Sequence, residues 1–265
     1  MTTRRVMPGF GLTLGVTLMY FGLLAVLPLA ALVWAAAGAP GRSWAALGDA
    51  RTLAAMRVSF GAAALAAVLN VPLGVLLAWV LGRYRVPGRR VLDALIDLPF
   101  ALPTAVAGIA LATLYADTGW FGAAGFAYGP AGIVVALLFI GLPFVVRSVQ
   151  PVLAALDRSA EEAAMTLDAT PWQVFRYVVL PPLMPAVLTG AALAFARGVG
   201  EYGSVIFIAG NRPGVSEIVP LLIVTKLDQF DVPGAAVLSV AMLAVSVLIL
   251  AGLNAIDWWG RTHVR

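Results

Sequence analysis

The sequence predicts an all-α membrane protein with six transmembrane helices. Of its 265 residues, 62% are hydrophobic and 11% are charged, whereas soluble domains carry about 45–50% apolar and about 25% charged residues. The apolar residues lie in long stretches with few charges, each near the roughly 20 residues that a helix needs to cross a bilayer. This composition excludes a soluble globular domain and a disordered chain.

The first three spans are assigned from uncharged stretches and from the prolines that interrupt them. Residues 11–36 and 58–82 contain no Asp, Glu, Lys or Arg, so each is expected to form a helix through the bilayer. Residues 93–116 are expected to form the third span, although Pro99 and Pro103 interrupt it. A membrane tolerates the backbone groups that proline frees only against protein or a water-filled cavity, so this span is expected to face one of them.

The last three spans complete one transmembrane domain over residues 1–265. A Gly-Pro pair at 129–130 interrupts the apolar stretch after the third span, so the fourth span is expected at 131–146. The fifth is expected at 185–209 and the sixth at 232–256. A further apolar segment, 216–230, is too short to cross the bilayer and is expected to be either a re-entrant helix or an outer lid.

The distribution of positive charge orients the chain. Six spans place both ends on one side, and the loops and ends of that side hold eleven of the lysines and arginines, against five in the other loops. Because cytoplasmic loops are enriched in Lys and Arg, both termini and loop 148–183 are expected in the cytoplasm. Arg4 and Arg5 before an apolar stretch also resemble a signal peptide. The apolar region of a signal peptide usually has only about 7–15 residues, however, and the stretch in this chain is far longer.

Loop 148–183 is predicted to contain two short helices. Ser159 and Glu162 fit the capping-box pattern at the start of the first helix. Thr170 and Gln173 fit the same pattern at the start of the second, with a proline at its first position. The loop is therefore expected to be a structured element below the membrane.

The turn and the apolar side chains of this loop indicate a docking surface. Asp168 lies in the turn between the two helices, and a Leu-Pro-Pro segment at 180–182 is expected to end the second helix. A hairpin without a partner is the alternative, but a solvated surface would not carry so many large apolar side chains. These are Met165, Leu167, Trp172, Val174, Phe175 and Tyr177.

The loop resembles the EAA motif of ABC-importer permeases. Glu162-Ala163-Ala164, position 168 and Leu180-Pro181 keep the spacing of that motif, and Asp168 replaces its glycine. A positive φ is expected there, which Gly adopts most easily and Asp tolerates. The resemblance implies the type I ABC-importer permease fold and docking of a dimer of ABC ATPase subunits. It implies coupling through Glu161, Glu162, Ala163, Ala164, Leu167, Asp168, Leu180 and Pro181.

Three further segments, 83–108, 143–153 and 200–211, resemble the sulfate/thiosulfate (CysT-type) branch of these permeases. The resemblance implies a multi-pass protein of the cell inner (cytoplasmic) membrane that imports sulfate or thiosulfate. The ion would come from a periplasmic or extracellular binding protein, and a second, different permease subunit would complete a heterodimer. A molybdate or tungstate importer with a permease homodimer is the alternative, because these ions are also tetrahedral dianions; residues 200–211 favour sulfate.

The energy for import must come from another polypeptide. Moving a dianion inward against ~100 mV costs about 4.6 kcal/mol, yet the only lysine, Lys226, follows Thr225, so no G-x-x-x-x-G-K-[ST] phosphate loop exists. ATP and Mg²⁺ are therefore expected on the ATPase, and no cofactor or metal on this chain. A passive channel would leave the docking loop unexplained.

Other function classes are disfavoured by residue content. There is no Cys, and the only histidine is His263, so a membrane-embedded enzyme would lack a nucleophile–base pair and a metal cluster. The formal charge of +4 is explained by loop orientation, and no nucleic-acid partner is expected.

Charges inside the bilayer mark a candidate path or gate. Arg197 and Glu201 are four residues apart in the fifth span, so they are expected to pair on one helix face. A purely structural pair is the alternative. The candidate path or gate comprises Pro103, Thr104, Arg197, Glu201 and Ser204.

A second charged pair lies nearer the basic loop. Asp93 and Asp97 are also four residues apart, and they are expected to pair with the arginines of the segment 83–90. The role expected of this pair is structural.

Overall fold

The computed structural model describes residues 10–263, and the side chains of residues 10–252. Within that part of the chain all regular secondary structure is helical, which confirms the predicted fold class. Arg4 and Arg5, and the side chain of His263, lie outside the described residues.

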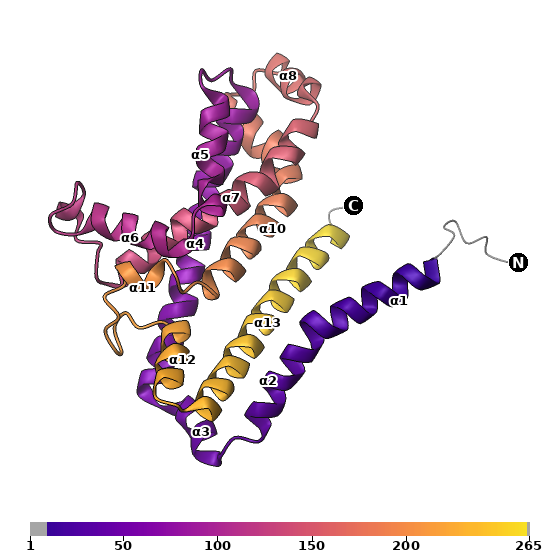
Figure 1. Ribbon diagram of the computed structural model, residues 1–265. Coiled ribbons are helices and arrows are strands. Elements are labelled where there is room, and N and C mark those ends of the chain that lie inside the picture. Colours follow the sequence, from indigo (N-terminus) through magenta and orange to yellow (C-terminus); the bar gives the residue numbers. More distant parts are fainter. Residues whose placement is uncertain (1–9, 264–265) are drawn as a thin grey trace, which may run out of the picture.

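Figure 1 shows the arrangement of the helices. Their bounds are α1 Phe10–Phe21, α2 Leu27–Ala37, α3 Gly41–Ala45, α4 Ala50–Arg83, α5 Arg89–Ala101, α6 Thr104–Tyr115, α7 Pro130–Ala155, α8 Arg158–Thr166, α9 Pro171–Gln173, α10 Leu180–Val199, α11 Val205–Ile208, α12 Val219–Asp228 and α13 Val232–His263. π-helical segments at Gly22–Val26 and Val174–Val179 join α1 to α2 and α9 to α10, so each pair forms one long helix.

Among the described residues, five continuous helices are long and apolar enough to cross a bilayer, and the bent pair α5–α6 is a sixth candidate. The first, second, fourth and sixth expected spans lie within α1–α2, α4, α7 and α13. Helix α7 continues to Ala155, so the first part of the expected loop 148–183 is helical.

The third expected span, 93–116, corresponds to the bent pair α5–α6, with the sharp bend at one of the two prolines that interrupt it. Helices α5 and α6 meet at an angle of 112°. Leu102, which precedes Pro103, has the extended backbone (φ −82°, ψ 136°) that a following proline imposes. Pro103 has no N–H to continue the hydrogen bonding of α5, and it begins α6 as its N-cap residue.

The fifth expected span, 185–209, was misplaced. One helix runs from Pro171 to Val199, so Pro181 and Pro182 do not stop it and residues 200–204 are not helical. The π-helical segment lies directly before the two prolines, and such local adjustments satisfy the backbone groups that prolines free.

The core is the packing of α4 against α7 and α10, which lie side by side in Figure 1. Small residues let the backbones approach closely: a Cβ atom added to Gly190 of α10 would lie 2.8 Å from the Cα of Val145 in α7. Alanines of α4, including Ala63 and Ala78, are buried in the same core. This is the small-residue packing expected where lipid provides no hydrophobic force between helices.

Segment 216–230, for which the sequence left a re-entrant helix and an outer lid as alternatives, contains the short helix α12 packed against α13 and α4. The buried Glu217 accepts hydrogen bonds of 2.8 and 2.7 Å from the Arg51 guanidinium at the start of α4. The Ser59 hydroxyl accepts a 2.8 Å bond from the Val219 N–H. These contacts fix the segment to α4.

Candidate functional site

The elbow after α8 is a Schellman-type helix end. Asp168 has a φ of 59°, which confirms the expected positive value. The Asp168 N–H donates to the Met165 carbonyl (3.1 Å) and the Ala169 N–H to the Ala164 carbonyl (3.2 Å), the two bonds that define this motif. Thr170 and Gln173 then form the expected capping box and begin α9. The substitution of Asp for Gly at 168 therefore preserves the elbow.

The start of α8 differs from the expectation. The cap is Asp157, whose carboxylate accepts hydrogen bonds from the Ser159 N–H (3.0 Å) and the Ser159 hydroxyl (2.6 Å). The predicted capping box of Ser159 and Glu162 was wrong, because the helix begins at Arg158 and Ser159 lies in its first turn. The two bonds from Ser159 hold the pKa of Asp157 below its usual value.

Glu161 faces inward and joins α8 to the long helix α4. Its carboxylate accepts a charge-assisted hydrogen bond from the guanidinium of Arg83, the last residue of α4. The two side chains are 16% and 10% exposed, and the same guanidinium lies over the Trp79 ring, 5.8 Å from its centroid. The carboxylate of Glu161 therefore faces the end of α4 rather than solvent.

The outer surface of the elbow is apolar and exposed. Leu167 is 83% exposed and Tyr177 is 73% exposed, and Met165 and Trp172 are exposed beside them. Val174 was expected on this surface but is buried, and Phe175 packs edge-on against Trp79 with ring centroids 5.4 Å apart. Val174 and Phe175 therefore point inward because the helix continues into the core.

The expected coupling residues occupy both sides of this elbow. Glu162 and Ala163 are exposed, and Pro181 is exposed further along the second helix. Ala164 and Asp168 line a hollow of about 370 Å³ between the two helices. Leu180 is half-buried.

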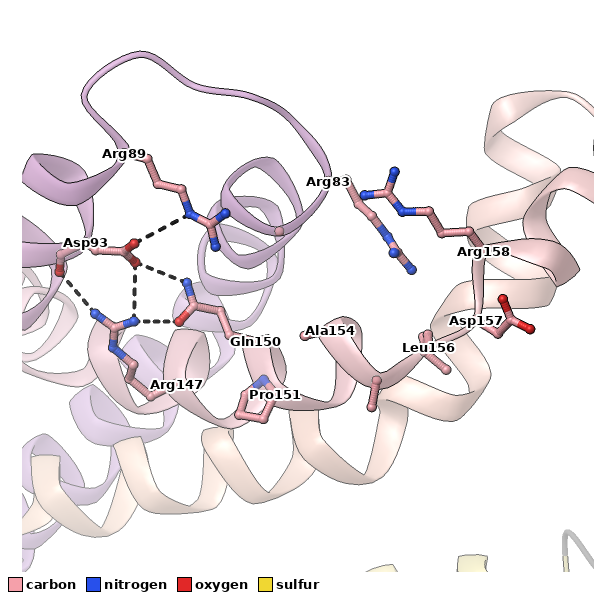
Figure 2. Close-up of a pocket in the computed structure, with 12 residues that line it drawn as sticks. Arg83, Arg89, Asp93, Arg147, Gln150, Pro151, Ala154, Leu156, Asp157 and Arg158 are labelled. Atoms are coloured by element: carbon pink, nitrogen blue, oxygen red, sulfur yellow. Dashed lines mark hydrogen bonds and ion pairs between the residues drawn. The ribbon is translucent and has the colours of Figure 1, made fainter.

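Arg147 of α7 holds α5 in place, a role that the sequence analysis missed. Its guanidinium donates two bonds to the Asp97 carboxylate, of 2.8 and 2.6 Å. It also donates to Asp93 (3.3 Å) and to the Gln150 side chain (2.6 Å). Asp93 and Asp97 were expected to pair with arginines of 83–90, but only Arg89 contributes, at 3.7 Å from Asp93. Figure 2 shows Arg89, Asp93, Arg147 and Gln150 of this cluster.

The charged pair of the candidate path forms, although not on one helix face. Helix α10 ends at Val199, and Glu201 follows it in a nonhelical segment. An Arg197 Nη1 to Glu201 Oε2 distance of 2.6 Å joins the pair. Glu201 is 2% exposed, and its other oxygen accepts bonds from the Ser204 N–H (2.9 Å) and hydroxyl (3.0 Å). The carboxylate thus shapes the loop that breaks the helix.

This loop packs against the start of α6. A Cβ atom on Gly203 would collide with the Thr104 side chain, and one on Gly108 would collide with the Ser204 backbone. Thr104 directly follows Pro103, at the sharp bend between α5 and α6. The structure therefore gathers the candidate path residues of both segments at the bend, next to the broken end of α10. Among residues 10–252, no three His, Cys, Asp or Glu side chains group as a metal site.

Comparison with known sequences gives one family. Residues 70–260 match the family described as "Binding-protein-dependent transport system inner membrane component". The sulfate transport system permease protein CysT of Escherichia coli (strain K12) is 47% identical over 263 residues, covering 97% of this chain and 95% of the relative. The protein of the same description from Synechocystis sp. is 45% identical over 258 residues, covering 94% and 90%.

Solved structures show the same fold. A bacterial ABC transporter involved in the import of alginate matches with a TM-score of 0.75 at 15% identity over 94% of both chains. A bacterial alginate ABC transporter in complex with an alginate pentasaccharide-bound periplasmic protein matches with a TM-score of 0.74 at 16% identity, covering 94% and 93%. The inward-facing MetNI methionine ABC transporter matches with a TM-score of 0.56 at 19% identity, covering 77% and 92%.

Proposed function

Because the chain belongs to the family of binding-protein-dependent transport inner membrane components and, within it, to the CysT-type sulfate permeases, we propose that it is the permease subunit of an ATP-driven sulfate importer. The observation that carries this proposal is 47% identity over 97% of the chain to a sulfate transport permease. The relatives reported above are named for sulfate transport, so the molybdate or tungstate alternative is not favoured. Import of thiosulfate stays a prediction.

The chain is a multi-pass inner-membrane subunit, and we infer that ATP is hydrolysed elsewhere in the importer. Its only lysine lies in no phosphate-loop pattern, so ATP and Mg²⁺ belong to an ABC ATPase dimer. That dimer docks on the exposed apolar surface of the elbow, around Leu167 and Trp172. This orientation puts the elbow, and with it both termini, on the cytoplasmic side, as the charge distribution predicts.

Motion of the docked ATPase reaches the membrane through two ionic contacts. Glu161 joins α8 to α4 through Arg83, and Arg147 joins α7 to α5 through Asp97. Helix α5 ends at the bend before Pro103, where Thr104 meets the loop that holds Glu201. Sulfate passage is gated at this bend. A carboxylate repels sulfate, so Glu201 shapes the gate through Arg197 and Ser204 rather than binding sulfate.

Two further partners complete the proposed importer. A substrate-binding protein delivers sulfate, since the family is that of binding-protein-dependent systems and a related importer was solved with its periplasmic protein. A second, different permease subunit forms the other half of the pathway. Purification of the tagged chain in mild detergent should recover an ATPase and a second permease. Recovery of this chain as the sole permease would contradict the heterodimer.

Uptake of radiolabelled sulfate by cells tests the function itself. Cells that lack this chain should lose uptake, and a plasmid copy should restore it. Excess unlabelled sulfate should compete with the labelled ion, whereas molybdate at the same concentration should not. Restored molybdate uptake without sulfate uptake would overturn the sulfate assignment.

A further inference from the structure

A basic cavity opens between α8 and the ends of α4, α5 and α7. Its volume is about 920 Å³, and its charged lining consists of four arginines and two aspartates. The arginines come from four different helices, as Figure 2 shows. The charged residues are Arg83, Arg89, Arg147, Arg158, Asp93 and Asp157.

Both aspartates already have partners. Asp93 accepts hydrogen bonds from Arg147 (3.3 Å) and Gln150 (3.4 Å). Asp157 accepts two bonds from Ser159 at the start of α8, and Figure 2 shows its carboxylate pointing away from Arg83 and Arg158. Neither aspartate of the lining therefore neutralises Arg83 or Arg158.

Three of the arginines keep unused donors. Arg158 has no ion pair among the described residues, and the nearest carboxylate oxygen to Arg89 is 3.7 Å away. Arg83 is nine-tenths buried, and its Nε–H has no hydrogen-bond partner within the described structure, although Nη2 binds Glu161. Unused guanidinium donors from three helices surround one hollow, an arrangement that suits an anionic acceptor entering it.

We propose that this cavity binds a tetrahedral oxyanion group, phosphate or sulfate, between Arg83, Arg89 and Arg158. Planar guanidinium groups match the oxygens of such an anion and donate paired hydrogen bonds to them. The group belongs either to a free inorganic anion or to an anionic phospholipid, since both present the same oxygens. A bound anion bridges α4, α5 and α8, so it braces the elbow from behind.

Thermal unfolding of the chain, purified with its partners, tests the site. Sulfate and inorganic phosphate are titrated at constant ionic strength, with chloride as the balancing salt. Both should raise the Tm. The variant Arg89→Gln with Arg158→Gln removes two exposed cations and should raise the concentration that gives half the shift by about tenfold, the loss expected for charge-assisted hydrogen bonds. The matched control is Arg90→Gln, which changes an exposed neighbour outside the cavity lining.

The lipid composition separates the two sources of the anion. The same titration is run in nanodiscs of phosphatidylcholine and of phosphatidylglycerol. A free anion gives the same shift in both. If the anion is a lipid headgroup, phosphatidylglycerol already occupies the site, so sulfate no longer raises the Tm in phosphatidylglycerol nanodiscs. That lipid then co-purifies with the wild type but not with the double variant. Either result supports the oxyanion site.

Three results would overturn the proposal. One is a double variant with the wild-type sulfate response. The second is a wild type that shows neither an anion shift nor a retained phospholipid. The third is an Arg90→Gln response weakened as much as that of the double variant, which would indicate general surface charge. Sulfate uptake by the wild type is measured separately, so failure of this site leaves the proposed function standing.

Discussion

Arg83, the last residue of α4, donates a hydrogen bond to the carboxylate of Glu161 in the middle of α8. Both side chains are largely buried. The bond joins the element that we propose binds the ATPase to a helix of the membrane core. A rigid link of this kind would carry motion of α8 into α4 instead of letting the elbow move freely.

Loss of this link should uncouple the importer. Glu161→Gln removes the charge that Arg83 faces, and breaking one partner of a buried ion pair costs about 3–5 kcal/mol. Radiolabelled sulfate uptake should fall while the ATPase still co-purifies. The exchanged pair Arg83→Glu with Glu161→Arg should recover part of the uptake. Normal uptake in both Glu161→Gln and Arg83→Gln would show that the link is not needed.

Docking of the ATPase should depend on the exposed side of α8. Glu162→Lys reverses an exposed charge, and Ala163→Asp adds bulk and charge on the same exposed side. Each should abolish co-purification of the ATPase while the chain stays in the membrane. Ala124→Asp, on an exposed connection outside the elbow, is the control and should retain the ATPase. ATPase recovery from both elbow variants would reject the docking assignment.

The elbow should improve when its left-handed residue becomes glycine. Asp168 has a positive φ, which costs a residue with a Cβ atom about 1 kcal/mol relative to glycine. Asp168→Gly should therefore keep transport and leave the Tm unchanged or slightly higher. Asp168→Val, a β-branched residue, should lower both. A stable and active Asp168→Val protein would show that the positive φ is not required.

Mutations of Arg197 and Glu201, which pair at the end of α10, should compensate for each other. Arg197→Ala leaves the buried Glu201 carboxylate without its cation, which destabilises the segment after α10. Uptake or assembly should fall, and Glu201→Ala in the same chain should restore part of it. Arg197→Lys keeps the charge and serves as the matched control. If each single alanine variant transports normally, the pair is incidental.

Local chemistry explains which features could be predicted. The turn at Asp168 and the cap at Thr170 depend on neighbouring residues, and both were correct. The Leu-Pro-Pro segment at 180–182 was expected to end the second helix, and this was wrong. A proline lacks an N–H donor, but the helix can continue if the preceding turn adjusts its hydrogen bonding. The π-helical segment Val174–Val179 lies at that position, and its presence depends on packing that the sequence does not display.

Long-range partners could not be predicted in the same way. Arg147 is fifty residues from Asp97 and carries no local signal for that contact, and Glu161 is seventy-eight residues from Arg83. The charge pattern placed these side chains at one membrane face. Only the tertiary structure, in which α7 packs against α5 and Glu161 of α8 reaches the end of α4, selects the pairs.

Sulfate uptake by proteoliposomes tests the central claim most directly. The chain is reconstituted with its ATPase, its second permease and its binding protein, and radiolabelled sulfate is supplied on the side of the binding protein. Accumulation should require ATP inside the vesicles and should be absent with the Glu162→Lys chain. Equal accumulation without ATP would contradict the account, because the chain would then be a passive pathway for sulfate rather than a permease coupled through its elbow.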